Sequence, residues 1–168
     1  EKCTAAVGAG IYISYKPSIL IDGCLFSENN ATTSGGVIDG NTKGSLIKNS
    51  QFIKNRADTG SGSGFGGAIF LEGNATIYNC IFKENYAASG GGAIHNKAIL
   101  TVQECLFERN RAGDDGGALL SLIEDSDHFI VKDSQFIANY TSQEDGGGIA
   151  LYSGNVDGCT FYENSSGR

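Results

Sequence analysis

The sequence contains no methionine and no tryptophan, and Pro17 is its single proline. No stretch approaches the ~18–20 unbroken apolar residues that a transmembrane helix requires, so we expect no membrane span in this chain. Basic side chains are also few, since 12 of them against 19 acidic ones give a net charge of −7. Nucleic-acid-binding surfaces need clustered positive charge, so we expect no nucleic-acid partner. The chain begins at Glu1 without a signal-peptide pattern, so we expect a processed chain or a piece of a longer protein.

Glycine is abundant, with 25 residues in 168, and its order shows an internal repeat. The motif Phe-x-x-Asn occurs six times. Its first positions are Phe26, Phe52, Phe82, Phe107, Phe136 and Phe161. Its last positions are Asn29, Asn55, Asn85, Asn110, Asn139 and Asn164. A second motif, three small residues and then an aliphatic one, alternates with the first at 8–11, 35–38, 66–69, 91–94, 116–119 and 146–149. The chain therefore has six repeats of about 25 residues within a single predicted domain, residues 1–168.

The spacing inside each repeat predicts short strands. A Cys or Ser stands two residues before each Phe, at Cys24, Ser50, Cys80, Cys105, Ser134 and Cys159. A β-branched aliphatic residue stands three places earlier, at Ile21, Ile47, Ile77, Val102, Val131 and Val156. Because strand side chains alternate with a period of two, a gap of three requires a bend between these positions. Each repeat is predicted to hold two strands at an angle, a turn at the Asn, and a third strand after the glycine pair.

Three short strands per repeat predict an all-β fold, a single-stranded parallel β-helix of about six coils. Helical repeats would need apolar stripes with a period of 3.6 and few glycines. Leucine-rich repeats would need a Leu-x-x-Leu-x-Leu core, which is absent. Successive coils stack about 4.8 Å apart, so we expect a buried core ladder of Phe and a turn ladder of hydrogen-bonded Asn side chains.

The cysteines follow the repeat. Cys24, Cys80, Cys105 and Cys159 share one inward position with two serines, so we expect free, buried, small apolar side chains that belong to the core ladder. A disulfide between Cys80 and Cys105 stays open, since they lie on adjacent coils. Cys3 lies outside this register and could pair with a thiol outside the chain.

The combination of Gly-Gly-Ala-Ile, at 66–69 and 91–94, with Phe-x-x-Asn resembles the repeats of the polymorphic membrane proteins, large surface adhesins of chlamydiae. Similar repeats occur in right-handed parallel β-helix proteins of other bacteria and of some protists. The resemblance covers the whole chain, coil by coil. It implies a right-handed β-helix and an extracellular or cell-surface passenger region used in adhesion or surface structure.

Four sequons fit Asn-x-Ser/Thr and are candidate glycosylation sites: Asn30, Asn74, Asn139 and Asn164. Asn139 and Asn164 also belong to the turn ladder, so we expect Asn30 and Asn74 to be the better acceptors.

Two insertions are predicted to form loops, Thr59–Gly64 and Leu122–His128. The second contains Glu124, Asp125 and Asp127, which could bind Ca²⁺, but the spacing of a calcium loop is absent and we expect a solvated acidic loop without a metal or other cofactor. The pairs 114–115 and 144–145 add acidic groups before two glycine pairs, so we expect one negative edge that includes this loop.

Enzymes are a weaker alternative. Pectinases and polysaccharide lyases share the predicted fold, but the sequence has no Gly-His-Gly, Asn-Thr-Asp or Arg-x-Lys element of the pectinase type. His95 and His128 have no nucleophile partner at a recognisable spacing, so no catalytic residue is predicted.

A solenoid exposes unpaired backbone at its end coils, and this sequence shows no capping element. We therefore expect the ends to be continued by more of the same chain or by a copy stacked head to tail. The favoured function is a non-enzymatic rod or fibre subunit. The alternative is an adhesin passenger that binds a glycan or a cell-surface receptor.

Overall fold

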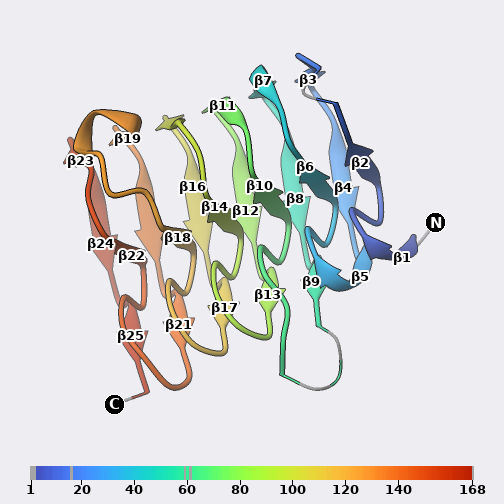
Figure 1. The fold of residues 1–168 in the computed structure, drawn as a ribbon. Coiled ribbons are helices and arrows are strands. Elements are labelled where there is room, and N and C mark those ends of the chain that lie inside the picture. Colours follow the sequence, from blue (N-terminus) through green and yellow to red (C-terminus); the bar gives the residue numbers. More distant parts are fainter. Residues whose placement is uncertain (1–2, 16, 59, 61, 168) are drawn as a thin grey trace.

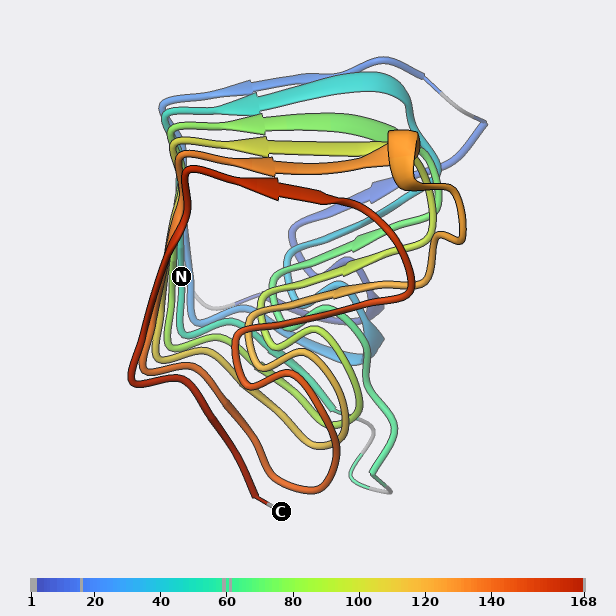
Figure 2. The ribbon, with the colours of Figure 1, turned by 90° about the vertical axis from the view of Figure 1, so that its left-hand side faces the viewer.

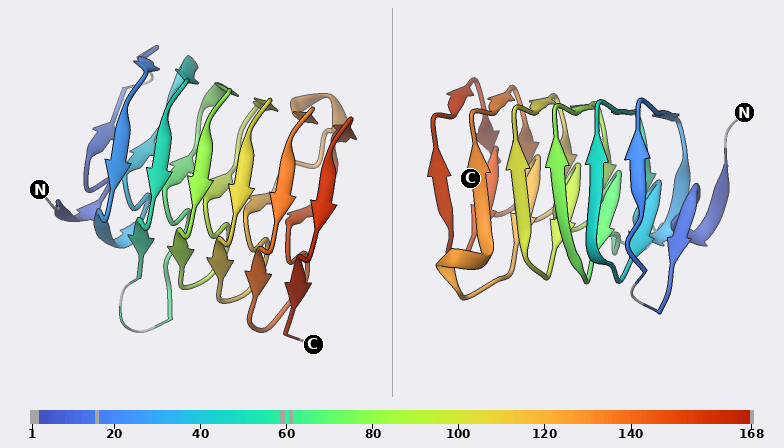
Figure 3. Two further views of the ribbon diagram at one scale, coloured as in Figure 1. Left: turned by 180° about the vertical axis from the view of Figure 1, so that it is seen from behind. Right: turned by 90° about the horizontal axis from the view of Figure 1, so that it is seen from above.

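A computed structural model describes residues 3–15, 17–58, 60 and 62–167. This part of the chain winds into a rod in which every strand pairs with its parallel neighbours one coil away (Figure 1). Seen along the axis, the coils superpose (Figure 2), and seen from above, their strands run side by side along the rod (Figure 3). The all-β parallel solenoid of about six coils is confirmed.

The strands form four parallel sheets. Sheet A contains β1 (Thr4–Val7), β5 (Asn30–Ser34), β9 (Arg56–Ala57), β13 (Tyr86–Ala87), β17 (Arg111–Ala112), β21 (Tyr140–Thr141) and β25 (Ser165–Ser166). Sheet B contains β2 (Ile11–Ile13), β6 (Ile38–Gly40), β10 (Ile69–Leu71), β14 (Ile94–Asn96), β18 (Leu119–Ser121) and β22 (Ile149–Leu151). Sheet C contains β3 (Leu20–Asp22), β7 (Lys43–Lys48), β11 (Asn74–Tyr78), β15 (Leu100–Gln103), β19 (Phe129–Lys132) and β23 (Asn155–Asp157). Sheet D contains β4 (Leu25–Ser27), β8 (Gln51–Ile53), β12 (Ile81–Lys83), β16 (Leu106–Glu108), β20 (Gln135–Ile137) and β24 (Thr160–Tyr162).

The prediction of three strands per coil is wrong, because sheet A adds a fourth. Its strands follow the motif Asn directly, where the sequence predicted only a turn. Most of them have two residues, one outward and one small inward residue such as Ala57 or Ala112, both fully buried. Two residues are too few to show a period of two, so the pattern could not reveal this sheet.

The predicted bends between sheets C and D are confirmed. The second residue of each bend has the left-handed backbone conformation, with φ between 48° and 64°, at Gly23, Asn49, Asn79, Glu104, Asp133 and Gly158. Five of these six positions carry Gly, Asn or Asp, which favour turns, whereas Glu104 has no such preference and holds the conformation because the stacked coils impose it.

The glycine pair makes the corner between sheets A and B. Gly91, the first of one pair, has φ of 67°. Gly92, the second, has no room for a side chain, since a Cβ would lie 2.0 Å from the carbonyl oxygen of Gly117 in the next coil. The two glycines therefore have different roles: Gly91 supplies the left-handed backbone conformation, and Gly92 allows the stacked backbones to approach closely.

The core ladder runs the length of the rod. Successive Phe rings stack with centroids 4.7–5.0 Å apart and interplanar angles of 2–17°. Phe52, Phe82, Phe107 and Phe136 are fully buried. The expectation of burial is wrong at both ends, because Phe26 is only partly buried and Phe161 is 50 % exposed. These two rings belong to the end coils of the described structure and have a ring on one side only.

The Cys/Ser ladder makes hydrogen bonds that a purely apolar filler would not. The side chains of Cys80 and Ser50 each donate to the carbonyl oxygen two residues earlier, at 3.3 Å and 2.7 Å. The backbone N–H of Cys80 donates to Sγ of Cys105 at 3.4 Å, just as that of Cys24 donates to Oγ of Ser50 at 3.1 Å. The thiol and the hydroxyl thus make the same hydrogen bonds at the bend, which explains why serine replaces cysteine in two of the six coils.

All five cysteines are free thiols, and Cys3 is exposed. The expected burial holds for Cys80 and Cys105 but is wrong for Cys24 and Cys159, which are only partly buried because they lie in the end coils. The hydrogen bond with Cys80, together with burial, holds the pKa of the Cys105 thiol well above its ordinary value.

Candidate functional site

The turn ladder is a continuous chain of side-chain amides. In each coil the backbone N–H and Nδ2 of the motif Asn both donate to Oδ1 of the Asn in the next coil, at 2.8–3.1 Å. The second Nδ2 hydrogen donates to the Phe carbonyl of the preceding coil, for example from Asn110 to Phe82 at 2.9 Å. The inner members are almost completely buried and have every amide hydrogen bonded. The ladder is therefore structural, and its inner members leave no amide group free for a ligand.

Cys3 stands in the register of this ladder. Thr4 pairs with Asn30, and the N–H of Asn30 donates to the carbonyl of Cys3 at 3.0 Å, as the N–H of Arg56 donates to the carbonyl of Asn29 at 2.9 Å. Cys3 therefore lies outside the Cys/Ser register, as expected, but the sequence did not show that it occupies the position of a motif Asn in the first coil.

The four sequons differ sharply in exposure. Asn139 is fully buried, and its Nδ2 donates to Asn164 and to the Phe107 carbonyl, so its selection as a glycosylation candidate is contradicted by the structure. Asn164 is partly buried and its Nδ2 donates to the Phe136 carbonyl.

The remaining two sequons lie at the starts of β5 and β11. Asn30 is partly buried, and its Oδ1 is buried without a hydrogen-bond partner in the described structure. Asn74 is exposed at the first position of β11, with Thr76 exposed two residues later. Asn74 is therefore the sequon whose side chain is open to solvent.

The acidic loop contains the 3₁₀ turn η1 (Ser126–His128), where Asp125 accepts the N–H of Asp127 at 3.0 Å and lies 3.0 Å from Nδ1 of His128. Among the described residues no three His, Cys, Asp or Glu side chains are grouped so that they could hold a metal ion. Thr59 and Ser61 of the other predicted insertion lie outside the described residues.

The expected single negative edge is wrong. The structure brings Asp115, Glu144 and Asp145 together on the corner between sheets A and B, whereas the loop 122–128 connects sheet B to sheet C. The strands of sheet B separate the two groups. Sequence order alone placed both near the same coils but could not tell which corner of the coil each occupies.

The outer face of sheet B is the most distinctive surface of the rod. Its strands have three residues each, and the central ones form an outward ladder: Tyr12, Asp39, Phe70, His95, Leu120 and Ala150. Phe70, His95 and Leu120 are nevertheless at most 7 % exposed, because loops fold over them. Phe65 packs edge-on against His95 with centroids 5.0 Å apart, and His95 stacks on Phe70 at 5.1 Å. Sequence reasoning treated His95 as a lone histidine and missed this cluster.

His95 has an unusual environment. Both ring nitrogens are buried and lack a hydrogen-bond partner in the described structure. Burial, followed by the charge of Lys97, lowers the pKa of His95 to about 4, with the Gly90 backbone acting weakly in the opposite direction. His95 is therefore neutral at neutral pH and serves as an aromatic ring in this cluster.

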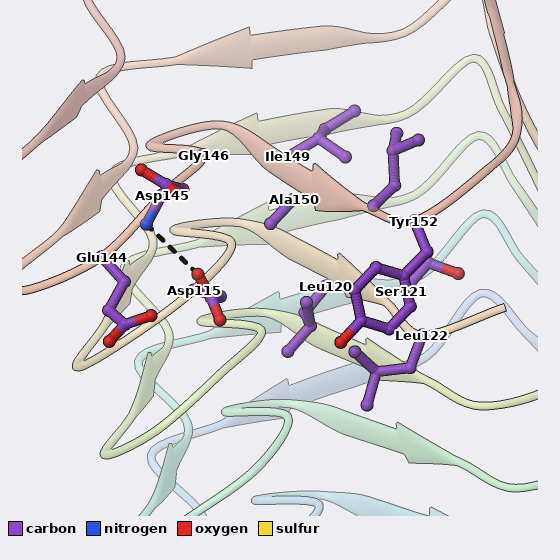
Figure 4. A pocket seen from close by; sticks show the side chains of 11 residues that line it. Asp115, Leu120, Ser121, Leu122, Glu144, Asp145, Gly146, Ile149, Ala150 and Tyr152 are labelled. Atoms are coloured by element: carbon purple, nitrogen blue, oxygen red, sulfur yellow. Dashed lines mark hydrogen bonds between the residues drawn. The ribbon is translucent and has the colours of Figure 1, made fainter. Parts of the chain in front are cut away.

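Beyond His95 the cover ends and a groove of about 490 Å³ opens over β18 and β22 (Figure 4). Asp115 and Glu144 lie on one side, Leu122 and Tyr152 on the other, and Leu120 lies between them (Figure 4). This groove is the candidate binding site, since it combines concave shape, apolar surface and charge.

A second feature missed in the sequence is an Arg–Tyr ladder on the outer face of sheet A. The guanidinium of Arg56 lies 4.2 Å from the ring centroid of Tyr86, and that of Arg111 lies 5.3 Å from that of Tyr140. Each of these four residues directly follows a motif Asn, so Arg and Tyr alternate at that repeat position in the sequence. The alternation becomes meaningful only once sheet A is known.

The described part of the chain contains no helix long and apolar enough to cross a membrane. Comparison with protein families finds that a model described as a right-handed β-helix region matches residues 1–115 and 58–168, which together include every coil. Comparisons with curated proteins and with solved structures find no match.

Proposed function

Because the chain belongs to the right-handed β-helix family, we propose that it is a non-enzymatic structural rod of the cell surface or extracellular space that assembles end to end into a fibre. The observation that carries this proposal is the exposed C-terminal coil. Val156 is 41 % exposed and Phe161 is 50 % exposed, whereas Val131 and Phe136, one coil earlier, are fully buried. One more coil, either of the same chain or of a second copy, would remove these apolar ladder positions from water, and the proposal assigns that place to a second copy.

The N-terminal coil offers a matching surface. Strands β2, β3 and β4 are the first strands of sheets B, C and D, and β22, β23 and β24 are the last. Stacking one copy on the next would place Phe26 on Phe161 in the same register that joins every internal pair of coils. Such a contact uses two different surfaces and is open-ended, so it generates a filament.

Sheet A sets a condition on this stacking, because it has seven strands where each other sheet has six. Thr4 pairs with Asn30 in the first coil, and Ser165 pairs with Tyr140 at the same repeat position in the last. Strand β1 of the next copy would therefore need the place that β25 occupies. The two residues of β25 are exposed, so we infer that β1 displaces them during assembly.

Electron microscopy and sedimentation velocity over a range of concentrations test this proposal. We expect fibres with an axial repeat of ~30 Å, six coils at about 4.8 Å each, and longer fibres when residues 165–168 are removed. Val156→Lys should block assembly, whereas Tyr162→Lys, on the outward side of the same coil, should not. Discrete rods at every concentration, including those of the shortened chain, would refute end-to-end assembly.

An adhesin passenger is the second candidate function. It is supported by the groove over sheet B and by the finer resemblance of the repeats to those of polymorphic membrane proteins. This function requires single rods of one length with saturable binding to a receptor or glycan, so the same sedimentation experiment separates it from the fibre.

We also propose that Asn74 accepts an N-linked glycan in a host that glycosylates secreted chains, since it is the exposed sequon. Mass spectrometry of protein secreted from such a host should show a glycan that is lost in Asn74→Gln and retained in Asn30→Gln. A glycan on Asn139 of the folded protein would contradict the buried amide ladder.

A further inference from the structure

The outer face of sheet B is divided into a covered half and an open half. Over Phe70 and His95 the chain supplies its own cover, with Phe65 lying across both rings. Gly90 then approaches Leu120 so closely that a Cβ on Gly90 would lie 2.4 Å from Cδ2 of Leu120. Past this point Ala150 continues the same outward ladder, but only partly buried. Phe65 thus shows, over the coil next to the groove, how an apolar side chain can occupy this face.

The open half has a sharply divided chemistry. Its apolar part comes from Leu122, Ala150 and Tyr152, with the largely covered Leu120 at its inner end, and its other wall comes from three carboxylates (Figure 4). Asp115 accepts the backbone N–H of Asp145 at 3.2 Å, which holds its carboxylate at the rim. No basic side chain lines the groove, and no ion pair in the described structure involves Asp115, Glu144 or Asp145. The wall therefore carries negative charge that no ion pair among the described residues neutralises.

We propose that this groove binds a segment of a partner protein in which arginine or lysine side chains flank an apolar residue. Such side chains have an apolar stem and a cationic head, which match the apolar floor and the acidic wall in that order. The volume of 490 Å³ falls within the ~300–1,000 Å³ usual for ligand sites.

Tyr152 strengthens the preference for a cation. Tyr152 is 72 % exposed beside the groove, and aromatic faces attract guanidinium groups. The protein already makes this contact twice on sheet A, between Arg56 and Tyr86 and between Arg111 and Tyr140. A neutral sugar would leave the three carboxylates without counter-charge, and a free polyamine would leave the apolar floor without an apolar group to cover it.

Fluorescence anisotropy with a labelled peptide, Gly-Arg-Phe-Arg-Gly, tests the proposal. We expect saturable binding that weakens as salt rises from 0.1 M to 1 M, because the screening length falls from about 10 Å to about 3 Å. The peptide Gly-Glu-Phe-Glu-Gly should not bind. Spermidine and maltohexaose serve as unlabelled competitors and should not displace the peptide at equal concentration.

Matched variants separate the groove from general charge attraction. Glu144→Gln with Asp145→Asn should weaken binding roughly fivefold or more, as expected for the loss of two exposed ion pairs. Glu124→Gln with Asp127→Asn changes the net charge equally on the loop outside the groove and should leave binding unchanged. Ala150→Arg should abolish binding by placing a tethered guanidinium against the acidic wall.

Equal weakening by both double variants would reduce the effect to general charge attraction and overturn the proposal. Displacement by spermidine would reassign the groove to free polyamines, and displacement by maltohexaose would reassign it to glycans. Absence of saturable peptide binding to the unchanged chain would overturn it directly. Circular dichroism of each variant shows that it is folded before binding is compared. Binding on the side of the rod does not require end-to-end assembly, so each proposal can fail without the other.

Discussion

Truncating one amide of the turn ladder should cost far more stability than the size of the side chain suggests. In Asn110→Ala, Asn85 loses the Oδ1 acceptor for both its backbone N–H and its Nδ2, and the Phe82 carbonyl loses its side-chain donor. All three groups lie in a buried region, since Asn85, Asn110 and Phe82 are at most 1 % exposed. An unsatisfied buried polar group costs about 1–3 kcal/mol, so we expect a loss of at least about 3 kcal/mol in the free energy of unfolding.

Urea denaturation followed by circular dichroism measures this loss, and two comparisons sharpen it. Asn164→Ala should cost less, because this end-coil side chain is only partly buried. Asn74→Ala, at an exposed strand position, should change stability by no more than about 0.5 kcal/mol. If Asn110→Ala costs no more than Asn74→Ala, the buried hydrogen bonds of the ladder do not stabilise the fold.

Three further predictions follow from the backbone and the buried histidine. Ala138 has φ of 53°, and the left-handed conformation costs a residue with a Cβ about 1–2 kcal/mol, so Ala138→Gly should raise the free energy of unfolding by up to about 1 kcal/mol, whereas Ala112→Gly in a buried strand should lower it. Gly92→Ala should prevent formation of the native coil stack, measured as loss of β-sheet circular dichroism, because its Cβ would meet the Gly117 carbonyl at 2.0 Å; an unchanged spectrum and midpoint would show that the coils can separate there. Folding lowers the pKa of His95 to about 4, so the free energy of unfolding is unaffected by this group above its unfolded pKa near 6.5 and falls by up to about 3 kcal/mol as the pH drops toward 4. His95→Phe should remove that part of the pH dependence of stability. Identical pH profiles of the two proteins would contradict this prediction.

The alternation of cover and opening along sheet B has a simple physical origin. A solenoid repeats its backbone, but each coil can carry a different connection between strands, and those connections decide what lies over the outer face. The connection that carries Phe65 covers the coils of Phe70 and His95, whereas the connections near Asp115 and Asp145 stand beside β18 and β22 and leave a groove. Which parts of this face stay open therefore depends on loops that the repeat does not specify.

The repeat made the fold and its core predictable. The spacing of Phe and Asn placed every core ring and every ladder amide in register, since each coil packs on its neighbour and one period describes all contacts along the axis. The bends between sheets C and D also followed from one break in alternation. The same pattern suggested that Cys24, Cys80, Cys105 and Cys159 share one position, and all four are found at the same bend.

The tertiary structure alone decided the features that depend on neighbouring coils rather than on a period. The two-residue strands of sheet A exist because the backbone of the adjacent coil supplies their partners, and no sequence pattern of that length reports it. The place of Cys3 in the Asn register, the burial of Asn139 and the cover over His95 arise in the same way. The groove is the strongest case, because its carboxylates and its apolar floor come from two coils and meet only when the corner between sheets A and B is folded beside sheet B. The period of a sequence determines which residues stack, but the path of each loop determines which surfaces stay open.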